Sequence, residues 1–471
     1  MIFTPDKLTY ALSTVAAYGL LCGTVAWQHR RRQQAAQRRV AALLPATPGM
    51  PAWWVTYASQ TGQAEELALQ TAQALHTAGV PVRLAALGEL SASDLQEAER
   101  LLCVASTYGE GDPPDSAARF AQQVMASARP DLSHLHVGLL ALGDRAYAHF
   151  CGFGRVLDEW LRARGAQPLF ERIEVDKSDP EALRRWRQQL AHLAGTSDLP
   201  DWEAPALQPW RLRARQHLNP GSAGEPVFHI ELVPQTGQAL PDWQAGDLAQ
   251  VAVPGAEGAP RDYSIASVPQ DGAVHLLVRL ARRADGSAGL ASGWLTQGAA
   301  LGDAVSMRVR AHAGFRMGDN AQRPLILIGN GTGLAGLRGH IRGRLAAAGA
   351  LGATPSPRPE GVAPLWLLFG ERHARHDAHH RAEIEGFVQQ GWLARVDWVF
   401  SRDQAERRYV QHALATHADA VRAWVGQGAA IYVCGSLEGM AGAVDRTLQD
   451  ILGADALQAM AAEGRYRRDV Y

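Results

Sequence analysis

The strongest constraint on the fold is an alternation of short apolar runs with amphipathic helical segments, found in two separate regions. Expected strands in the first region are Trp53–Ala58, Val82–Ala85, Leu101–Ala105, His136–Leu142 and Pro168–Glu171. Those in the second are Leu325–Ile328, Leu365–Phe369, Arg395–Phe400 and Ala430–Val433. Strands that alternate with helices predict parallel sheets covered by helices on both faces. The first region is therefore expected to be a doubly wound domain with the flavodoxin-like arrangement, and the second is expected to be another α/β domain.

The stretch between the two regions follows a different pattern. From Arg211 to about Arg310 the apolar runs are shorter, alternate with polar residues and are separated by Gly/Pro turns. This pattern predicts an antiparallel β-barrel. A chain of 471 residues has room for about three domains.

The N-terminus carries a candidate membrane anchor. Leu8–Trp27 has no charged side chain over 20 residues, enough to cross a bilayer as a helix. A basic stretch follows from His29 to Arg39, so the positive-inside rule places everything after it in the cytoplasm. A cleaved signal peptide would need basic residues before the apolar run and small residues at a cleavage site, and neither is present. A surface helix remains the alternative.

The net charge and the spacing of the cysteines argue against a nucleic-acid-binding protein and against a cysteine metal site. The formal net charge is −1, which gives no electrostatic case for nucleic acid. The four cysteines are widely spaced, without a metal-ligand pattern. His373, His376, His379 and His380 form a tempting cluster, but we expect a solvated loop and helix start there, and no metal site.

Three loops at the carboxyl ends of the first region's strands could hold a phosphate and a flat ring. Hydroxyls and free amides at a helix N-terminus suit a phosphate monoester, and two tyrosines can sandwich an aromatic ring. The first loop comprises Ser59, Gln60, Thr61, Gly62, Gln63 and Ala64. The others comprise Ser106, Thr107, Tyr108 and Gly109, and Leu142, Gly143, Asp144, Tyr147, Phe150 and Cys151. Ordinary polar loops and core packing of the tyrosines are the alternatives.

These loops resemble the FMN domain of the diflavin reductases, the family of NADPH–hemoprotein reductase and sulfite reductase flavoprotein. The resemblance implies that Ser59 to Ala64 hold the FMN phosphate and that Tyr108 and Tyr147 flank the ring. It also makes Asp176 a candidate on the ribityl side. The nearby acids Glu110, Asp112 and Asp115 could steer a basic electron acceptor.

The barrel region carries a second pair of motifs. Arg261, Asp262, Tyr263 and Ser264 combine a cation, an aromatic face and a hydroxyl, and Gly289, Leu290, Ala291 and Ser292 open a helix. The pair resembles the FAD-binding barrel of ferredoxin–NADP reductase-like proteins. That resemblance implies that Arg261 pairs with the diphosphate, Tyr263 stacks on the ring and Ser264 bonds near the reactive nitrogen. Leu277, Val278 and Arg279 would lend backbone contacts.

The third region carries the signature of a nucleotide site. Gly331, Thr332 and Gly333 follow a strand and open a helix, in a GxGxG spacing. No acid follows about twenty residues later to hold a ribose hydroxyl. A set of donors that suits a 2′-phosphate comprises Ser401, Arg402, Arg407, Arg408, Tyr409 and Gln411, with Arg372 as a further candidate. NADPH is thus favoured over NADH, with random surface basicity as the alternative.

The same resemblance supplies a catalytic set. In the family a cysteine matched by Cys434 lies beside the nicotinamide, and with Ser264 and Asp469 it forms the hydride-transfer constellation. A terminal aromatic residue, here Tyr471, covers the FAD ring until nicotinamide displaces it. A buried structural cysteine and a frayed tail are the alternatives.

The expected organisation departs from the family in one respect. Only 14 residues separate Gly246 from Arg261, where diflavin reductases insert a helical connecting domain. The expected parts are an anchor with basic flank (1–39), a stalk (40–51), an FMN-binding domain (52–194), a linker (195–210), an FAD-binding barrel (211–316) and an NADP-binding domain (317–471). Without the connecting domain, docking of the FMN domain must rely on the linker, and swinging between two states is a natural hypothesis.

We therefore expect a diflavin reductase anchored in the inner membrane, with its catalytic domains in the cytoplasm. It would pass electrons from NADPH through FAD and FMN to a one-electron acceptor, with a heme protein as the first expectation and a membrane-embedded heme or quinone partner as another. A sulfite reductase flavoprotein, a direct reductase of ferric complexes or quinones, and a slow redox sensor remain alternatives.

Overall fold

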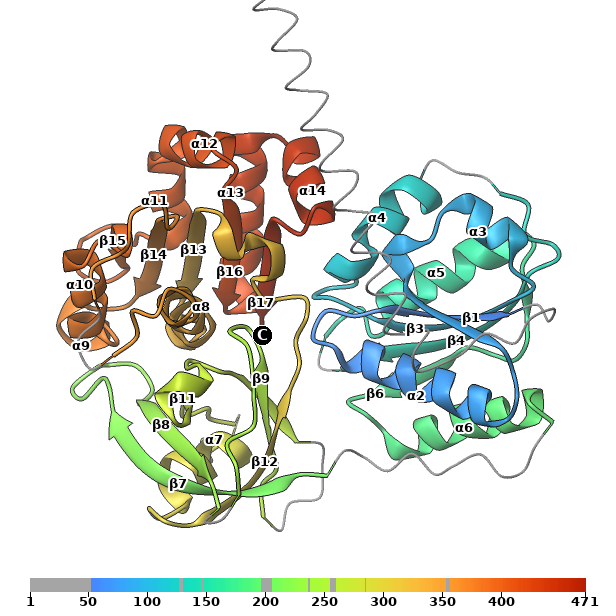
Figure 1. Ribbon diagram of the computed structural model, residues 1–471, viewed down its shortest axis with the longest axis horizontal. Helices are drawn as coiled ribbons and strands as arrows, with labels where there is room; N and C mark the ends of the chain where they lie inside the picture. Colours follow the sequence, from blue (N-terminus) through green and yellow to red (C-terminus); the bar gives the residue numbers. More distant parts are fainter. Residues whose placement is uncertain are drawn as a thin grey trace, which may run out of the picture.

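The computed structural model describes residues 52–126, 130–145, 147–195, 206–235, 238–254, 260–283, 285–352 and 356–471. They form three folded units, and the C-terminus lies where the three meet (Figure 1). The expected anchor and stalk fall outside the described residues. Within the described part of the chain, no helix combines the length and the apolar character that crossing a bilayer needs.

The first unit is a parallel sheet between two layers of helices. Its strands are β1 (Trp53–Ala58), β2 (Val82–Ala86), β3 (Arg100–Ser106), β4 (His136–Gly143), β5 (Gln167–Pro168) and β6 (Ile173–Asp176). They run in the order β2-β1-β3-β4-β5, with β6 also paired to β4. The main helices are α2 (Gln63–Thr77), α3 (Ala92–Glu97), α5 (Gly152–Ala163) and α6 (Pro180–Leu193). The expected flavodoxin-like fold is confirmed.

The fifth expected strand, Pro168–Glu171, is wrong in its extent. The chain pairs with the start of β4 as β5, leaves the sheet, and returns to the end of β4 as β6. The Phe170 ring lies over Gly138 of β4, where a Cβ would come within 2.7 Å of it, and packs edge-on against Trp186. Because Gly138 has no side chain, β4 leaves room for the Phe170 ring. The ring occupies the place where a regular strand was expected.

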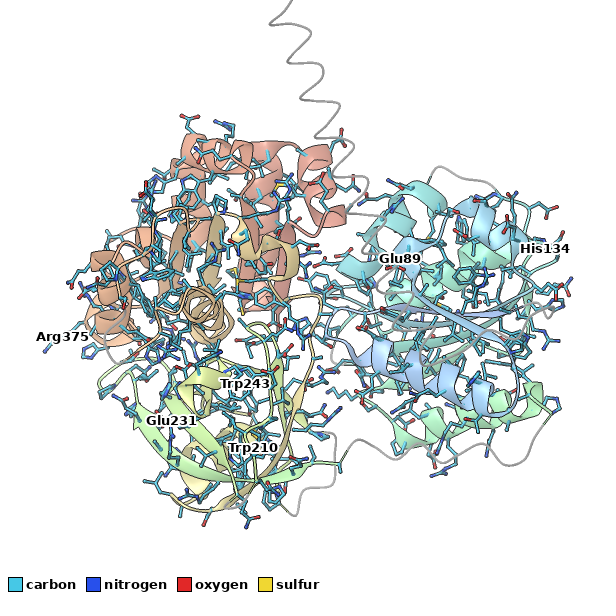
Figure 2. All side chains as sticks on the ribbon, in the orientation of Figure 1. Glu89, His134, Trp210, Glu231, Trp243 and Arg375 are labelled. Atoms are coloured by element: carbon cyan, nitrogen blue, oxygen red, sulfur yellow. The ribbon has the colours of Figure 1, made fainter. Side chains whose placement is uncertain are left out.

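The second unit is an antiparallel barrel. Its strands are β7 (Gln208–His217), β8 (Val227–Pro234), β9 (Leu248–Val251), β10 (Arg261–Ser264), β11 (Val274–Arg279) and β12 (Ala304–Arg310). They run in the order β10-β9-β12-β7-β8-β11, and a hydrogen bond from Ala266 N to His275 O (2.8 Å) joins the two ends. Trp210 and Trp243 are buried in this unit (Figure 2). Strand β7 begins at Gln208, inside the range expected to be linker.

The third unit is a second parallel sheet. Its strands are β13 (Leu325–Asn330), β14 (Leu365–Glu371), β15 (Leu393–Phe400), β16 (Ala430–Gly435) and β17 (Tyr466–Val470), in the order β15-β14-β13-β16-β17. The helices are α8 (Leu334–Ala347), α9 (Ala374–Asp377), α10 (Arg381–Gln389), α11 (Val410–Thr416), α12 (Ala418–Gly426), α13 (Gly442–Leu452) and α14 (Ala454–Ala462). The edge strand β17 was not predicted.

Candidate active site

A cavity of about 670 Å³ opens at the carboxyl ends of the third unit's strands. Its lining brings together most of the expected nucleotide-site residues: Gly331, Thr332, Arg372, Ser401, Arg402, Arg407, Arg408, Tyr409 and Gln411. Tyr471 and Arg279 line it as well. Gly333 does not line it and packs against the carbonyl of Cys434 instead. Asn330, Glu371, Ser436 and Met440 also line the cavity, and none of them was among the residues expected at this site.

The chemistry of this cavity fits a phosphorylated nucleotide. Arg402, Arg407 and Arg408 are exposed at its wall and present guanidinium donors to the space. The side-chain oxygen of Gln411 is buried and has no protein partner, as expected of a group that awaits a ligand. We interpret the cavity as the NADPH site.

A compact polar constellation lies at the junction of the barrel and the third unit. Ser264, at the end of β10, donates from Oγ to Asp469 Oδ2 at 2.7 Å. Cys434 Sγ lies 3.7 Å from the same carboxylate oxygen. All three are at most 7% exposed. Because β16 and β17 pair with Cys434 opposite Asp469, the fold itself sets this geometry.

The thiol in this constellation is neutral. Burial and the charge of Asp469 hold the pKa of Cys434 well above its usual range. The site therefore offers a hydroxyl, a protonated thiol and a carboxylate within hydrogen-bond reach of one another. Such a group can hold and orient a nicotinamide ring for hydride transfer.

The terminal residue lies beside this constellation. The amide of Tyr471 donates to Gly435 O (3.1 Å), and its hydroxyl donates to Thr332 Oγ1 (3.2 Å). Its side chain remains about half exposed (52%). Tyr471 is thus held at the cavity by two hydrogen bonds and is not a frayed end.

The expected FAD residues on the barrel divide into two groups. Tyr263 is half-buried, and burial raises its pKa to about 12, so it is a neutral ring. Arg261 is exposed on the same strand. Asp262, by contrast, is bound to the protein, because Arg310 Nη2 donates to its Oδ2 at 2.7 Å. This bond links β10 to β12 across β9, and the expected role of Asp262 as a cofactor ligand stays a prediction.

The second FAD element opens helix α7 (Leu290–Gly293) as expected. Gly289 lies so close to Ser292 that a Cβ would come within 2.9 Å of the Ser292 Oγ. Ala291 and Ser292 are buried, and Leu290 is exposed. On β11, the side chains of Leu277 and Val278 pack in hydrophobic cores, which leaves only their backbones for a ligand.

The side chain of Arg279 has contacts besides the expected backbone contact, which stays a prediction. Its guanidinium donates to Glu371 Oε1 at 2.5 Å and lines the nucleotide cavity, while its Nε is buried without a partner. It therefore lies between the barrel and the nucleotide site.

The expected phosphate loop follows β1 directly. Ser59 Oγ accepts from Gly62 N (2.9 Å), and Gly62 has a φ of 90°, a conformation that favours glycine. Thr61 is half-buried, Ala64 is buried, and Gln63 donates to Ser178 Oγ at 2.5 Å. The Gln60 side chain departs from expectation, because Nε2 donates to Arg468 O of the third unit (2.9 Å).

The second loop fits a ring site. Ser106 Oγ donates to Ala58 O, and Gly109 has a positive φ of 51°. Thr107 Oγ1 and the Tyr108 hydroxyl are buried and have no hydrogen-bond partner in the protein, which is unusual for buried polar groups outside a ligand site. Tyr108 is 7% exposed, and the Arg468 guanidinium lies 4.6 Å from its ring centroid.

The third loop is tied down by its own contacts. Leu142 is buried, and a Cβ on Gly143 would lie 2.7 Å from Cys151 N. Cys151 donates from Sγ to Ala141 O, and burial raises its pKa to about 12. Tyr147 and Phe150 are half-buried. Two acids hold the loop: Asp144 pairs with Lys177, and Asp176 accepts from Arg145 N.

The histidines set aside as a solvated loop are only partly so. His373 pairs with Asp403, and His376 contacts Pro220 O, both at the surface. His379 is 1% exposed and lies 3.5 Å from Glu371 Oε1, so the expectation is wrong for this residue. His379 lies beside Glu371, which lines the nucleotide cavity, and sequence spacing does not show this contact.

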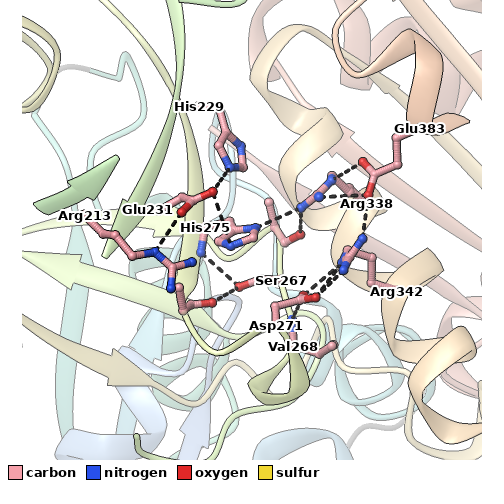
Figure 3. A network of polar contacts seen from close by, with 12 residues as sticks. Arg213, His229, Glu231, Ser267, Val268, Asp271, His275, Arg338, Arg342 and Glu383 are labelled. Atoms are coloured by element: carbon pink, nitrogen blue, oxygen red, sulfur yellow. Dashed lines mark hydrogen bonds and ion pairs between the residues drawn. The ribbon is translucent and has the colours of Figure 1, made fainter. Parts of the chain in front are cut away.

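A different group could hold a metal ion: His229 and Glu231 on β8 and His275 on β11, with ligand atoms within 4.8 Å of one another. The signal missed in the sequence is His229-x-Glu231, which places both side chains on one face of a strand. However, Arg213 donates to Glu231 and Arg338 Nη1 lies 3.4 Å from His275 Nδ1 (Figure 3). Two guanidinium groups on these ligands oppose a cation.

This group instead links the barrel to the third unit. From Arg338 on α8 the network continues to Glu383 on α10 (2.6 Å) and through Arg342 to Asp271 (Figure 3). Burial, with the Arg338 charge, lowers the pKa of His229 to about 4. Burial and His229 lower that of His275 to about 3, so both are neutral at pH 7.

Comparison with known proteins finds families that match the first and third units. The flavodoxin family matches residues 55–186, and the oxidoreductase NAD-binding domain family matches residues 327–446. The sulfite reductase [NADPH] flavoprotein alpha-component of Neisseria meningitidis is 28% identical over 99% of this chain and 97% of its own length. Those of Yersinia enterocolitica and Photobacterium profundum are 28% and 25% identical, over 92% and 88% of each chain.

The alignment with the Neisseria protein spans 605 positions, more than the 471 residues present here. That relative thus holds a substantial segment without a counterpart in this chain, in line with the short connection between Gly246 and Arg261. The two domain matches and these relatives support a diflavin reductase family, similar to the sulfite reductase flavoproteins, and the chain is an NADPH-dependent oxidoreductase that uses FMN and FAD.

Proposed function

We propose that this protein passes electrons from NADPH through FAD and FMN to a hemoprotein, with a sulfite reductase hemoprotein as the first candidate acceptor. The observation that carries the proposal is the Ser264–Asp469–Cys434 constellation beside an arginine-lined cavity. The names of the relatives favour sulfite reduction over other heme acceptors.

Each group of residues has a separate role in the proposed reaction. The arginines of the cavity bind the phosphates of NADPH, and Tyr471 yields its place when the nicotinamide enters. Asp469 orients the Ser264 hydroxyl and the Cys434 thiol towards the reacting ring, in a pocket from which water is excluded. When bound, the two flavins convert an electron pair into single electrons.

The test begins with an anaerobic NADPH titration of the purified protein. Uptake of about four electrons per chain is expected from two flavins in series. Uptake near two would contradict the relay. The loaded protein is then offered a purified sulfite reductase hemoprotein, cytochrome c or a ferric chelate, and sulfide production from sulfite supports the first acceptor. Rapid reduction of the chelate alone would favour a direct reductase of small molecules.

We also propose that the protein is attached to the inner membrane, with its catalytic units in the cytoplasm. The support is the uncharged stretch Leu8–Trp27 and the basic residues after it. The full chain should float with lipid vesicles in a density gradient, whereas a chain starting at residue 52 should not. Equal flotation of both, or of neither, would contradict the anchor.

A further inference from the structure

The last strand of the protein has two faces with different partners. Asp469 points into the hydride-transfer constellation, where Ser264 and Cys434 contact it. The neighbouring Arg468 points the other way, because successive strand residues alternate in direction. Its Nη2 donates to Asp115 of the FMN domain at 2.6 Å, and its guanidinium covers the Tyr108 ring.

The backbone of the same residue makes a second bond to the FMN domain. Arg468 O accepts from Gln60 Nε2 (2.9 Å), and Gln60 Oε1 in turn accepts from Asp115 N (2.9 Å). Gln60 belongs to the expected phosphate loop. One residue of β17 is therefore bonded to two loops of the flavodoxin-like unit, both of them expected FMN loops or their direct continuation.

The barrel adds an independent contact. Arg308 on β12 forms two hydrogen bonds with the carboxylate of Glu66 on α2, at 3.0 and 3.2 Å. Both side chains are largely shielded, with exposures of 18% and 27%. His312 Nε2 lies 2.7 Å from Gln60 O, and a Cβ on Gly62 would come within 2.9 Å of Ala311 O. The fit is therefore close in shape as well as in charge.

From these contacts we infer that β17, with Arg308 of the barrel, is the docking platform that sets the FMN domain against the FAD barrel. Arg468 is a positioning residue for electron transfer between the flavins. Asp469 and Arg468 are adjacent, so one strand aligns the hydride-accepting site on one side and the electron-receiving domain on the other. In this chain the platform takes the place of a connecting domain.

The inference rests on the proposed relay from FAD to FMN. In that step electrons pass one at a time from reduced FAD to oxidised FMN, and protons exchange with solvent. The ion pairs enter neither flavin's chemistry. They raise the fraction of molecules in which the two flavin sites face each other, and the observed transfer rate scales with that fraction.

The experiment compares Asp115→Asn and Glu66→Gln with wild type, in stopped-flow mixing with NADPH under anaerobic conditions. Hydride transfer to FAD should be unchanged, whereas FMN reduction should slow by about fivefold in each variant. Glu225→Gln is the matched control, since it removes the same charge from an ion pair with Arg282 inside the barrel. Flavin content is measured in every variant to show that FMN is retained.

Charge exchange gives the decisive result. Glu66→Arg alone should slow FMN reduction further, and the double variant Glu66→Arg with Arg308→Glu should recover it. Unchanged FMN reduction in Asp115→Asn and Glu66→Gln, with four-electron uptake intact, would overturn the docking platform and leave the relay standing. Two-electron uptake by wild type would instead overturn the proposed function.

Discussion

At the scale of single residues, the carboxylate of Asp469 joins Ser264 and Cys434 in the proposed hydride-transfer site. It accepts from Ser264 at 2.7 Å and lies 3.7 Å from the Cys434 sulfur. Asp469→Asn keeps the shape but replaces one acceptor oxygen with a donor. We expect hydride transfer from NADPH to slow by roughly 10- to 100-fold, with the Kd for NADPH nearly unchanged.

Single-turnover FAD reduction and coenzyme titration separate these two effects. Asp450→Asn, an exposed position on α13, is the control and should behave as wild type. A loss of NADPH affinity with normal hydride transfer would argue against the assigned role of Asp469.

We expect the coenzyme preference to reside in exposed guanidinium groups. Arg402 and Arg407 line the cavity without a carboxylate partner among the described contacts, which leaves their charge for a 2′-phosphate. Replacing both with Ala should raise the KM for NADPH about tenfold and leave that for NADH unchanged. Arg375→Ala, at an exposed position outside the cavity lining, is the control. An equal effect on both coenzymes would assign these residues to the pyrophosphate instead.

At the scale of elements, strands buried on both faces were the most predictable part of the fold. β1, β13, β14 and β16 begin at the expected residue, because parallel strands read as nearly continuous apolar runs. β17 gives no such signal, since its sequence is Tyr-Arg-Arg-Asp-Val and its polar side chains serve two neighbouring units. A strand whose side chains are used for contacts between domains cannot be predicted from local hydrophobicity.

The polar group of His229, Glu231 and His275 on β8 and β11 predicts that the barrel is less stable at acid pH. His229 and His275, whose pKa values in the folded state are about 4 and about 3, face Glu231, Arg338, His380, Glu383 and the Asp271–Arg342 pair. In the unfolded chain the two histidines bind protons near pH 6.5. Their contribution to the free energy of unfolding is therefore fully present above that pH and is lost as the pH falls towards 4. At pH 5 each histidine should lower the free energy of unfolding by roughly 1–2 kcal/mol relative to pH 7.5.

Urea unfolding at pH 7.5 and pH 5 measures this loss. His229→Gln should make the difference between the two pH values smaller, whereas His134→Gln, at an exposed position on the FMN domain, should not. An identical acid loss in wild type and His229→Gln would show that other groups carry it.

At the scale of the whole molecule, motifs predicted which residues form each site but not how the sites face one another. The lining residues between Gly331 and Tyr471 meet at one cavity because they follow strands of one sheet. The order of strands and loops in the sequence already indicates that these residues lie at the same edge. The bonds of Gln60 and Asp115 to Arg468 join residues more than 350 positions apart. Such contacts depend on the packing of complete domains, and no local pattern encodes them.

The docked arrangement has a consequence for the electron acceptor. Tyr108, expected to flank FMN, is 7% exposed and covered by Arg468, so a protein acceptor has little access to this side of the site. We therefore expect the FMN domain to leave the platform when it reduces a protein acceptor. Holding it in place should preserve electron transfer from FAD to FMN and suppress reduction of the acceptor.

A crosslink across the interface tests this requirement. Cysteines introduced at Glu66 and Arg308 are joined by a bismaleimide, since the three cysteines in the described part of the chain are buried. We expect cytochrome c reduction to fall at least about tenfold, while FMN reduction by NADPH continues. The same double variant without the linker is the control for loss of the ion pair. Undiminished cytochrome c reduction after complete crosslinking would mean that electrons leave the docked form, and that the FMN domain has no need to swing.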